Sequence, residues 1–390
     1  MRYLKSKWLL LSVLYLAQTV PMSFFVFGFP AILRQHGMSL ENIGLLRLVA
    51  VPWMLKFLWS PLVDRTALFK IGRRKSWIVI SLFLAIGVVL TLSQLNLSEH
   101  FSWIIGGFIL TSILCATNDI ATDGFAVELL DRAQRPTGNA IQVASIYAAR
   151  IIGAGILLVT YEHLGWRETM LFLALMLSLP LIPILFFPET PSEIPQRHSM
   201  WSFFRQPGIF SWLLLMIIMR AGVVCFGAML RPYMIDLKFS VTQVGVLLGM
   251  VGFSAALAGS LLSGWSIARW GRKNFFLFSM LFNALAIGLL PWVSPAQHVF
   301  FFLLILLHFI GEAANATIVF TMIMDRCRRA WGGTDFSIQQ SLFAFTLHIG
   351  ALSGFLAQAW GYSVFFVLCT ALTLLAVPLA LKTIDWNYQA

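Results

Sequence analysis

The chain has 390 residues, of which 59% are apolar and 11% are charged, and its formal net charge is +11. A soluble domain carries about 25% charged residues, so this composition excludes an ordinary soluble globular protein. The basic residues lie in short clusters between apolar blocks, in every second loop. This distribution favours the positive-inside pattern of a membrane protein over nucleic-acid binding.

Apolar blocks follow one another along the whole chain, and about 20 apolar residues suffice to cross a bilayer core. The first block has no clear small-residue cleavage site and further blocks follow it, so we expect an uncleaved helix there. The sequence therefore predicts an all-α integral membrane protein with twelve transmembrane helices. They are expected over residues 8–32, 41–62, 76–96, 101–130, 138–160, 167–188, 208–233, 241–267, 274–293, 298–324, 335–359 and 362–381.

One connection is longer than the others, and it divides the predicted helices into two sets of six. The stretch ETPSEIPQRHSMWSFFRQP (189–207) opens with two glutamates and two prolines, as expected of a linker. It predicts an N-terminal six-helix bundle over 1–188 and a C-terminal one over 208–390. Nineteen of the 27 Lys and Arg residues lie on one side and four on the other, which predicts that the linker and both termini are cytoplasmic.

An internal repeat relates the two predicted halves. Three pairs of similar segments occur in the same order, separated by 194 to 201 residues. Each pair lies at the same place in its half, so we expect two pseudo-repeats of six helices. The pairs are HGMSLENIGLL (36–46) with LKFSVTQVGVLL (237–248), GRRK (72–75) with GRK (271–273), and LLDRAQRPTG (129–138) with IMDRCRRAWG (323–332).

Several motifs carry a resemblance to a known family. KFLWSPLVDR (56–65), GRRKSW (72–77) and NDIATDG (118–124) resemble the muropeptide permease and acetyl-coenzyme A transporter branch of the major facilitator superfamily. GGTDFSIQQSL (332–342), together with the short chain, resembles bacterial importers of ferric siderophores of the rhizobactin and pyochelin kind. The resemblance implies the major facilitator fold, with substrate bound between the halves.

The function that this resemblance implies is secondary active transport. We expect a proton-coupled importer of a siderophore across the bacterial inner membrane, acting as a monomer and needing no cofactor beyond the proton gradient. The alternatives are a permease for muropeptides or other amphiphilic metabolites, and an exporter of the same fold. A receptor or membrane-embedded enzyme is disfavoured, because the sequence contains no H-E-x-x-H, G-x-S-x-G in context, P-loop or CxxC.

Ionisable residues inside a span are costly and usually line a cavity or pair with one another. Asp119 and Asp123 lie four residues apart, so they share a helix face. Asp119 and Arg150 each lie 12 residues from the same loop, which at 1.5 Å per residue places both about 18 Å deep. We interpret this group as a site for substrate or the coupling proton. The alternatives are a static ion pair between two helices and, for Asp123, a structural or gating role.

A similar group is expected in the second half. Glu312 and His308 are one helical turn apart, and His348 lies at a comparable depth on the next helix. Such a group could relay protons, because histidine titrates near neutral pH. The alternative is that each histidine is simply packed and hydrogen-bonded.

Three further cations lie within predicted spans. Arg220 and Arg47 could hold an anionic substrate through the bidentate guanidinium, or form a salt bridge to one of the acids already named. Lys56 lies close to the inside surface, so we expect it to extend toward that surface. No group of residues has metal-ligand spacing, so no metal site is expected.

The resemblance also implies a gating loop between the second and third helices. It would comprise Asp64, Arg65, Arg73 and Arg74, which would latch one conformation through charge pairs and helix ends. A plain positive-inside anchor is the alternative for the arginines, but acids do not anchor topology. The second-half copy of this loop, GRK (271–273), has no equivalent Asp, so no acidic partner is expected there.

Overall fold

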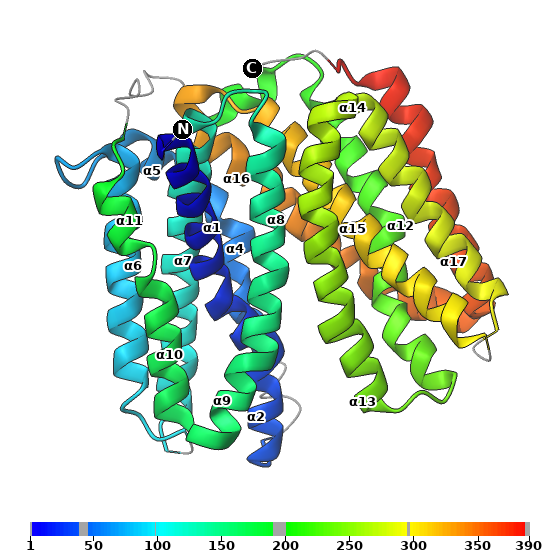
Figure 1. Cartoon of the computed structure of the whole chain (residues 1–390), viewed down its shortest axis with the longest axis horizontal. Coiled ribbons are helices and arrows are strands. Elements are labelled where there is room, and N and C mark those ends of the chain that lie inside the picture. Colours follow the sequence, from blue (N-terminus) through cyan, green and yellow to red (C-terminus); the bar gives the residue numbers. More distant parts are fainter. Residues whose placement is uncertain (1, 39–45, 98, 190–199, 295–296, 387–390) are drawn as a thin grey trace. The chain divides into compact units, whose positions relative to one another are not determined.

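The computed structural model describes residues 2–38, 46–97, 99–189, 200–294 and 297–386, and every regular element in these ranges is a helix (Figure 1). Nine helices of this described part are long and apolar enough to cross a membrane. Two of the nine each contain a glycine with non-helical backbone angles, Gly271 and Gly361, and so each is two helices. A broken helix within residues 46–65 completes the predicted set of twelve.

The chain forms two compact units, which we describe separately. Unit 1 is built from the described residues of Met1–Asp131, Ser145–Arg197 and Cys327–Ser341, and unit 2 from those of Arg132–Ala144, His198–Arg326 and Leu342–Ala390. Each unit thus includes a short segment from the other predicted half of the sequence. The domain boundaries predicted from the linker stay a prediction.

The helices of unit 1 are α1 (Arg2–Ser23), η1 (Phe24–Gly28), α2 (Phe29–Gln35), η2 (Leu46–Ala50), α4 (Val51–Leu55), η3 (Lys56–Leu58), α5 (Ser60–Arg65), α6 (Arg73–Leu92), α7 (Phe101–Leu129), η4 (Ile152–Ile156), α9 (Leu157–Leu164), α10 (Trp166–Ser178), α11 (Leu181–Phe186) and η8 (Arg329–Trp331). Two helices cross from one unit to the other, α8 (Arg135–Ile151) and α16 (Gly332–Phe345). The helices of unit 2 are η5 (Met200–Arg205), α12 (Ile209–Asp236), α13 (Val241–Val244), η6 (Gly245–Val251), α14 (Gly252–Leu289), η7 (Leu290–Trp292), α15 (His298–Asp325), η9 (Thr346–Leu352) and α17 (Ser353–Thr383).

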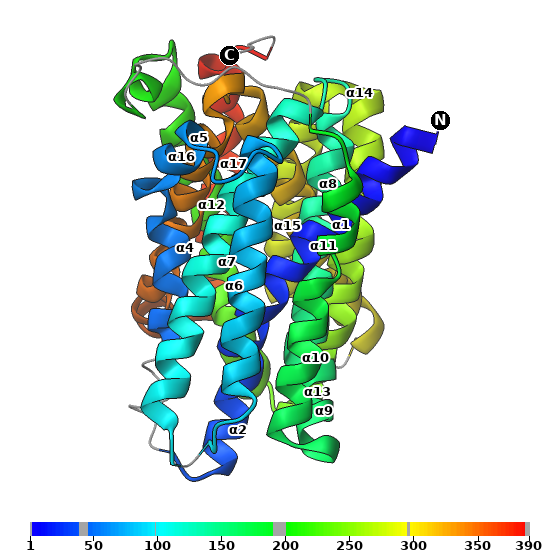
Figure 2. The ribbon, with the colours of Figure 1, turned by 90° about the vertical axis from the view of Figure 1, so that its left-hand side faces the viewer.

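Within unit 1, α7 is the helix that carries the polar interior. Its residues from Cys115 to Val127 are all buried, although Asn118, Asp119, Thr122 and Asp123 are polar. It packs against α6 along its length (Figures 1 and 2) and also against α1 and α5. Because buried polar groups need partners, this helix defines where a site can lie.

The second helix of the chain is not continuous. Residues 46–65 form two short α-helices and two 3-10 segments. Pro52 and Pro61 each stand in the first turn of one of the α-helices. Proline has no N–H to donate and favours such a position, so each one begins a new short helix. The interruption brings Lys56 to a 3-10 turn beside α7.

The predicted repeat is also present in the backbone. Residues with positive φ are rare outside glycine, and Lys238 is the single non-glycine case among the described residues. It stands at the position of the repeat that Gly37 occupies in the first half. Three pairs with positive φ are separated by 201, 199 and 196 positions, close to the spacing of the sequence repeat: Gly37 with Lys238, Gly72 with Gly271, and Gly165 with Gly361.

Candidate functional site

Two carboxylates on α7 form the centre of a buried polar cluster in unit 1. Asp119 and Asp123 are one turn apart on α7 and both are buried. The side chain of Lys56, which is 1% exposed, makes an ion pair with Asp119 and lies 3.6 Å from Asp123. Lys56 also donates a hydrogen bond to the side chain of Gln340 on α16. We call Lys56, Asp119 and Asp123 the lysine–aspartate cluster.

Helix α1 fixes both carboxylates of this cluster. The hydroxyl of Tyr15 donates a 3.1 Å hydrogen bond to Asp123, and the side-chain amide of Gln18 donates one to Asp119. Tyr15 and Gln18 are three residues apart, so they share a face of α1. The cluster is thus held by α1, α7, η3 and α16.

The expectation that Lys56 extends to the membrane surface is wrong. Its ammonium group is buried and ion-paired, because the break in the second helix directs it toward α7. Two buried acids on one helix face were a signal that a cation lies nearby, since a buried charge needs a partner. From its depth in the sequence, Arg150 was expected to be that cation, whereas the cation beside Asp119 is Lys56.

Arg150 lies at the end of α8. Its guanidinium lies 5.1 Å from the centre of the Tyr147 ring and 5.8 Å from that of Phe27. The cation that pairs with Asp119 is Lys56, and the role of Arg150 stays a prediction.

The predicted group in unit 2 is only partly assembled. His308 on α15 is buried, with its Nδ1 3.0 Å from the amide oxygen of Asn283 and its ring against Phe226. Glu312, one turn away, is half-buried, and His348 on η9 is exposed. Neither histidine is hydrogen-bonded to Glu312 in the part of the chain that the structure describes. The relay stays a prediction.

Of the two predicted anion-binding arginines, one lies in the described part of unit 2. Arg220 on α12 is 6% exposed, and its guanidinium lies 3.9 Å from the centre of the Phe343 ring. The side chain of Arg47 lies outside the described residues.

The predicted gating loop forms a second buried network in unit 1. Asp64 is fully buried and ion-paired to Arg74, and its carboxylate accepts hydrogen bonds from the backbone N–H groups of Gly333 (3.2 Å) and Thr334 (2.7 Å). These N–H groups belong to the first turn of α16, where unpaired donors favour an anion. A Cβ atom at Gly333 would lie only 2.8 Å from Asp64 Oδ1, so glycine allows this close approach. Asp64 therefore caps α16.

The loop arginines share an acid that sequence reasoning missed. Glu128, near the end of α7, lies 2.8 Å from both Arg73 and Arg74. Arg65 lies over the Trp331 ring, 4.9 Å from its centre. The pairing of these residues excludes a plain positive-inside anchor as the full account of Arg73 and Arg74.

A comparable network exists in unit 2, although no acidic partner was expected there. Asp325, at the end of α15, is ion-paired to Arg272 of the GRK segment and lies 3.0 Å from Arg135 of α8. The acid comes from the end of a different helix, so the local motif did not contain it. Asp325 is the repeat counterpart of Asp131, which is exposed.

A third ion pair joins Arg328 and Asp335, which lie 2.7 Å apart. Burial by itself lowers the pKa of the Arg328 guanidinium, whereas the hydrogen bonds and charge of Asp335 raise it, and the net pKa is above its usual value. Within the described ranges, no group of three or more His, Cys, Asp or Glu could hold a metal ion.

A model of the Major Facilitator Superfamily matches residues 11–350 and 212–385, which together cover most of the chain. The chain belongs to the Major Facilitator Superfamily. It is thus a multi-pass membrane transporter. The superfamily and the relatives named as permeases indicate a transporter and not an enzyme. Transporters of this superfamily generally need no cofactor.

The relatives of this major facilitator protein include named permeases. It is 23% identical over 376 residues to the anhydromuropeptide permease of Escherichia coli (strain K12), covering 93% of this chain and 76% of that protein. It is also 23% identical over 370 residues to the putative transporter AmpG 4 of Rickettsia felis, covering 88% of each. These relatives agree with the muropeptide-permease part of the resemblance and do not support closeness to siderophore importers.

Solved structures of other superfamily members have the same fold. A bacterial homologue of the iron transporter ferroportin in its outward-facing state matches with a TM-score of 0.74 at 17% identity, covering 98% of this chain and 99% of that one. A proton:xylose symporter matches with a TM-score of 0.76 at 11% identity, covering 98% and 96%. At these identities the likeness concerns the fold alone.

Proposed function

We propose that this protein is a proton-coupled importer of an amphiphilic, muropeptide-like solute across the bacterial inner membrane, with both termini in the cytoplasm. The relative named anhydromuropeptide permease, aligned over 93% of the chain, supports the solute class. The observation that carries the coupling is the lysine–aspartate cluster, in which one buried ammonium group faces two buried carboxylates.

The charge count of this cluster suggests how a proton takes part. With both carboxylates ionised the cluster has a net charge of −1, and one proton shared by Asp119 and Asp123 makes it neutral. A neutral buried cluster is favoured, because an uncompensated buried charge costs several kcal/mol. Loss and uptake of that proton would then change the bonds that Lys56 makes to α7 and α16.

Each unit has one arginine beside an aromatic ring that is a candidate for solute binding. A muropeptide-like molecule has carboxylates on its peptide and a polar sugar. Arg150 in unit 1 and Arg220 in unit 2 are separate candidates, because a guanidinium suits a carboxylate and the ring beside it suits an apolar or sugar face. Glu312, His308 and His348 remain candidates for a second proton path, and Arg47 a candidate for anion binding. A monomer is sufficient, because one chain of this fold forms a complete pathway.

The network around Asp64 would act as the gate. It joins the end of α5 and the start of α6 to the first turn of α16 through buried charge and helix-end contacts. The network would have two states. In one, Asp64, Arg74 and Glu128 are paired and buried; in the other, the pairs are broken and these groups are exposed to water, as a gate requires.

The test is uptake of labelled anhydromuropeptide in a deletion strain with and without this protein, with and without a protonophore, with ferric siderophores in the same panel. We expect protein-dependent anhydromuropeptide uptake that the protonophore abolishes. Uptake of a ferric siderophore and not of anhydromuropeptide would contradict the muropeptide-like solute and support the siderophore importer predicted from GGTDFSIQQSL. Net efflux of loaded solute would show an exporter.

A second experiment isolates coupling from binding. Asp123→Asn should abolish protonophore-sensitive accumulation while solute exchange across vesicles loaded on both sides persists. Loss of both activities in a well-folded variant would instead assign Asp123 to solute binding.

A further inference from the structure

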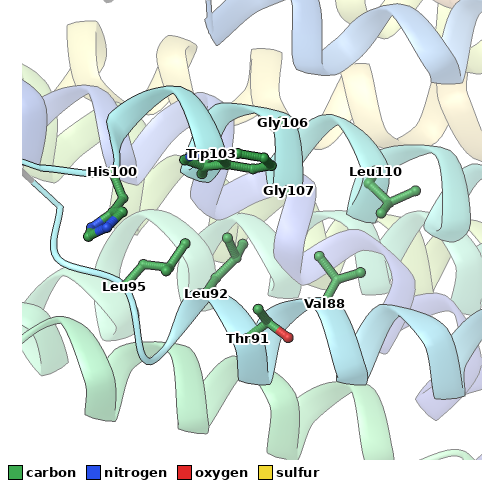
Figure 3. A pocket seen from close by; sticks show the side chains of 9 residues that line it. All are labelled: Val88, Thr91, Leu92, Leu95, His100, Trp103, Gly106, Gly107 and Leu110. Carbon is green, nitrogen blue, oxygen red and sulfur yellow. The ribbon is translucent and has the colours of Figure 1, made fainter.

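A groove lies between α6 and α7 at the end of this helix pair that is farthest from the Arg73–Arg74–Glu128 network (Figure 3). Leu92, which lines it, is nineteen residues after Arg73, so at 1.5 Å per residue the two are roughly 28 Å apart along α6. The groove has a volume of about 480 Å³, within the range of small-molecule sites. It is separate from the lysine–aspartate cluster, since none of that cluster's residues lines it.

The walls of the groove are apolar. Figure 3 shows Val88 and Leu92 of α6, and Leu95 just after its end, facing Trp103 and Leu110 of α7. Gly106 and Gly107 of α7 also line the groove, and Gly107 lets the Leu92 side chain pack closely, since an added Cβ there would lie 2.6 Å from Leu92 Cδ2. A Cβ atom at Gly106 would meet nothing within 4 Å, so that position opens directly into free volume.

The groove is continuous with the surface that lies in the bilayer. Trp103 is 75% exposed and Leu110 is 46% exposed, although both belong to a membrane-spanning helix. Leu84 and Leu90 on α6 extend the exposed apolar surface. In a multi-pass membrane protein this face contacts lipid, and tryptophan is typical of the boundary between acyl chains and headgroups.

A polar atom at one end of the groove has no protein partner. Nδ1 of His100, at the start of α7, is buried and makes no hydrogen bond to the described residues. His100 also lines the groove, so its imidazole is the group there that can hydrogen-bond to a molecule that fills it. The site therefore combines an apolar channel with one hydrogen-bonding group at its end.

We propose that this groove binds one phospholipid from the leaflet on the side of the α6–α7 loop. An acyl chain fills the space above Gly106, and an ester or phosphate oxygen accepts a hydrogen bond from an imidazole N–H of His100. The apolar walls, the lateral opening to the bilayer and the single polar end all match this amphipathic occupant.

The test is native mass spectrometry of the whole protein released from lipid nanodiscs, with identification of any lipid that stays bound as detergent is removed. Gly106→Leu and, from the opposite wall, Val88→Phe fill the groove. Gly87→Leu is the matched control, because Gly87 is an exposed position of α6 with equally open space that does not line the groove. His100→Ala removes the polar end and leaves the walls unchanged.

We expect wild type and Gly87→Leu to retain one phospholipid. Both groove-filling variants should retain about tenfold less or lower still, as expected when burial of a few methylene groups is lost. His100→Ala should retain less phospholipid than wild type. Equal retention in all variants, a bound molecule that is not a phospholipid, or a second protein copy in place of lipid would each overturn the proposal. Failure of one filling variant to fold leaves the other to decide.

Discussion

The carboxylate of Asp64 accepts a 2.7 Å hydrogen bond from the backbone N–H of Thr334, a residue 270 positions later in the chain. The same carboxylate is ion-paired to Arg74, and all of these groups are buried. One acid therefore stabilises a loop arginine and a helix start together.

Asp64→Asn should destabilise the protein by about 3–5 kcal/mol, the usual cost of breaking a buried ion pair, because Arg74 loses one of its two acidic partners. The amide can still accept a hydrogen bond from Thr334, so the helix start is partly preserved. Unfolding in mixed micelles measures the change. Arg65→Gln is the comparison variant, since Arg65 lies over Trp331 and is not part of the Asp64–Arg74 ion pair. Similar values for both variants would refute a special role for the Asp64 carboxylate.

Lys56→Met should leave two buried carboxylates without their cation, at a cost of about 3–5 kcal/mol. The double variant Lys56→Met/Asp119→Asn should recover much of that stability. Both charges of the Lys56–Asp119 pair are then absent, and the one remaining acid, Asp123, can be protonated. A double-variant cycle on the unfolding free energy measures the coupling. Additive effects of the two substitutions would show that Lys56 and Asp119 do not stabilise one another.

Asp325→Asn should destabilise unit 2 by about 3 kcal/mol, at the lower end for a buried pair because its two arginines are partly exposed. Its repeat counterpart Asp131 is exposed, so Asp131→Asn should change stability by no more than about 0.5 kcal/mol. Thermal unfolding in detergent compares the two. Equal shifts would mean that the repeat position, and not the ion pairs, determines the effect.

Gly153→Ala should be destabilising by about 1–3 kcal/mol, because an added Cβ would lie 2.5 Å from the backbone nitrogen of Phe24 where η4 crosses η1. Gly155→Ala, in the same π-helical segment, adds a Cβ that meets nothing within 4 Å. It should be neutral or slightly stabilising. Thermal midpoints measure both, and a larger loss at Gly155 than at Gly153 would contradict the crossing seen here.

Much of the fold could be predicted from local properties of the chain. Hydropathy is summed residue by residue, so the twelve spans, the loop lengths and the six-plus-six repeat follow from apolar blocks and turn residues. Gly72 and Gly271 illustrate this, since the repeated loop motif coincides with a repeated positive φ. The acidic residues of α7 and of the gating loop were also recognisable, because a charge inside a span is costly.

The partners of those charges were decided by tertiary structure alone. Lys56 faces Asp119 because Pro52 and Pro61 interrupt its helix, and no hydropathy pattern reports that change of direction. Glu128 and Asp325 reach their arginines from the ends of other helices. The amino-acid sequence by itself determined which segments cross the membrane and which charges must be paired. Only packing between segments far apart in the chain determined which group pairs with which, because ion pairs depend on distances that local sequence does not contain.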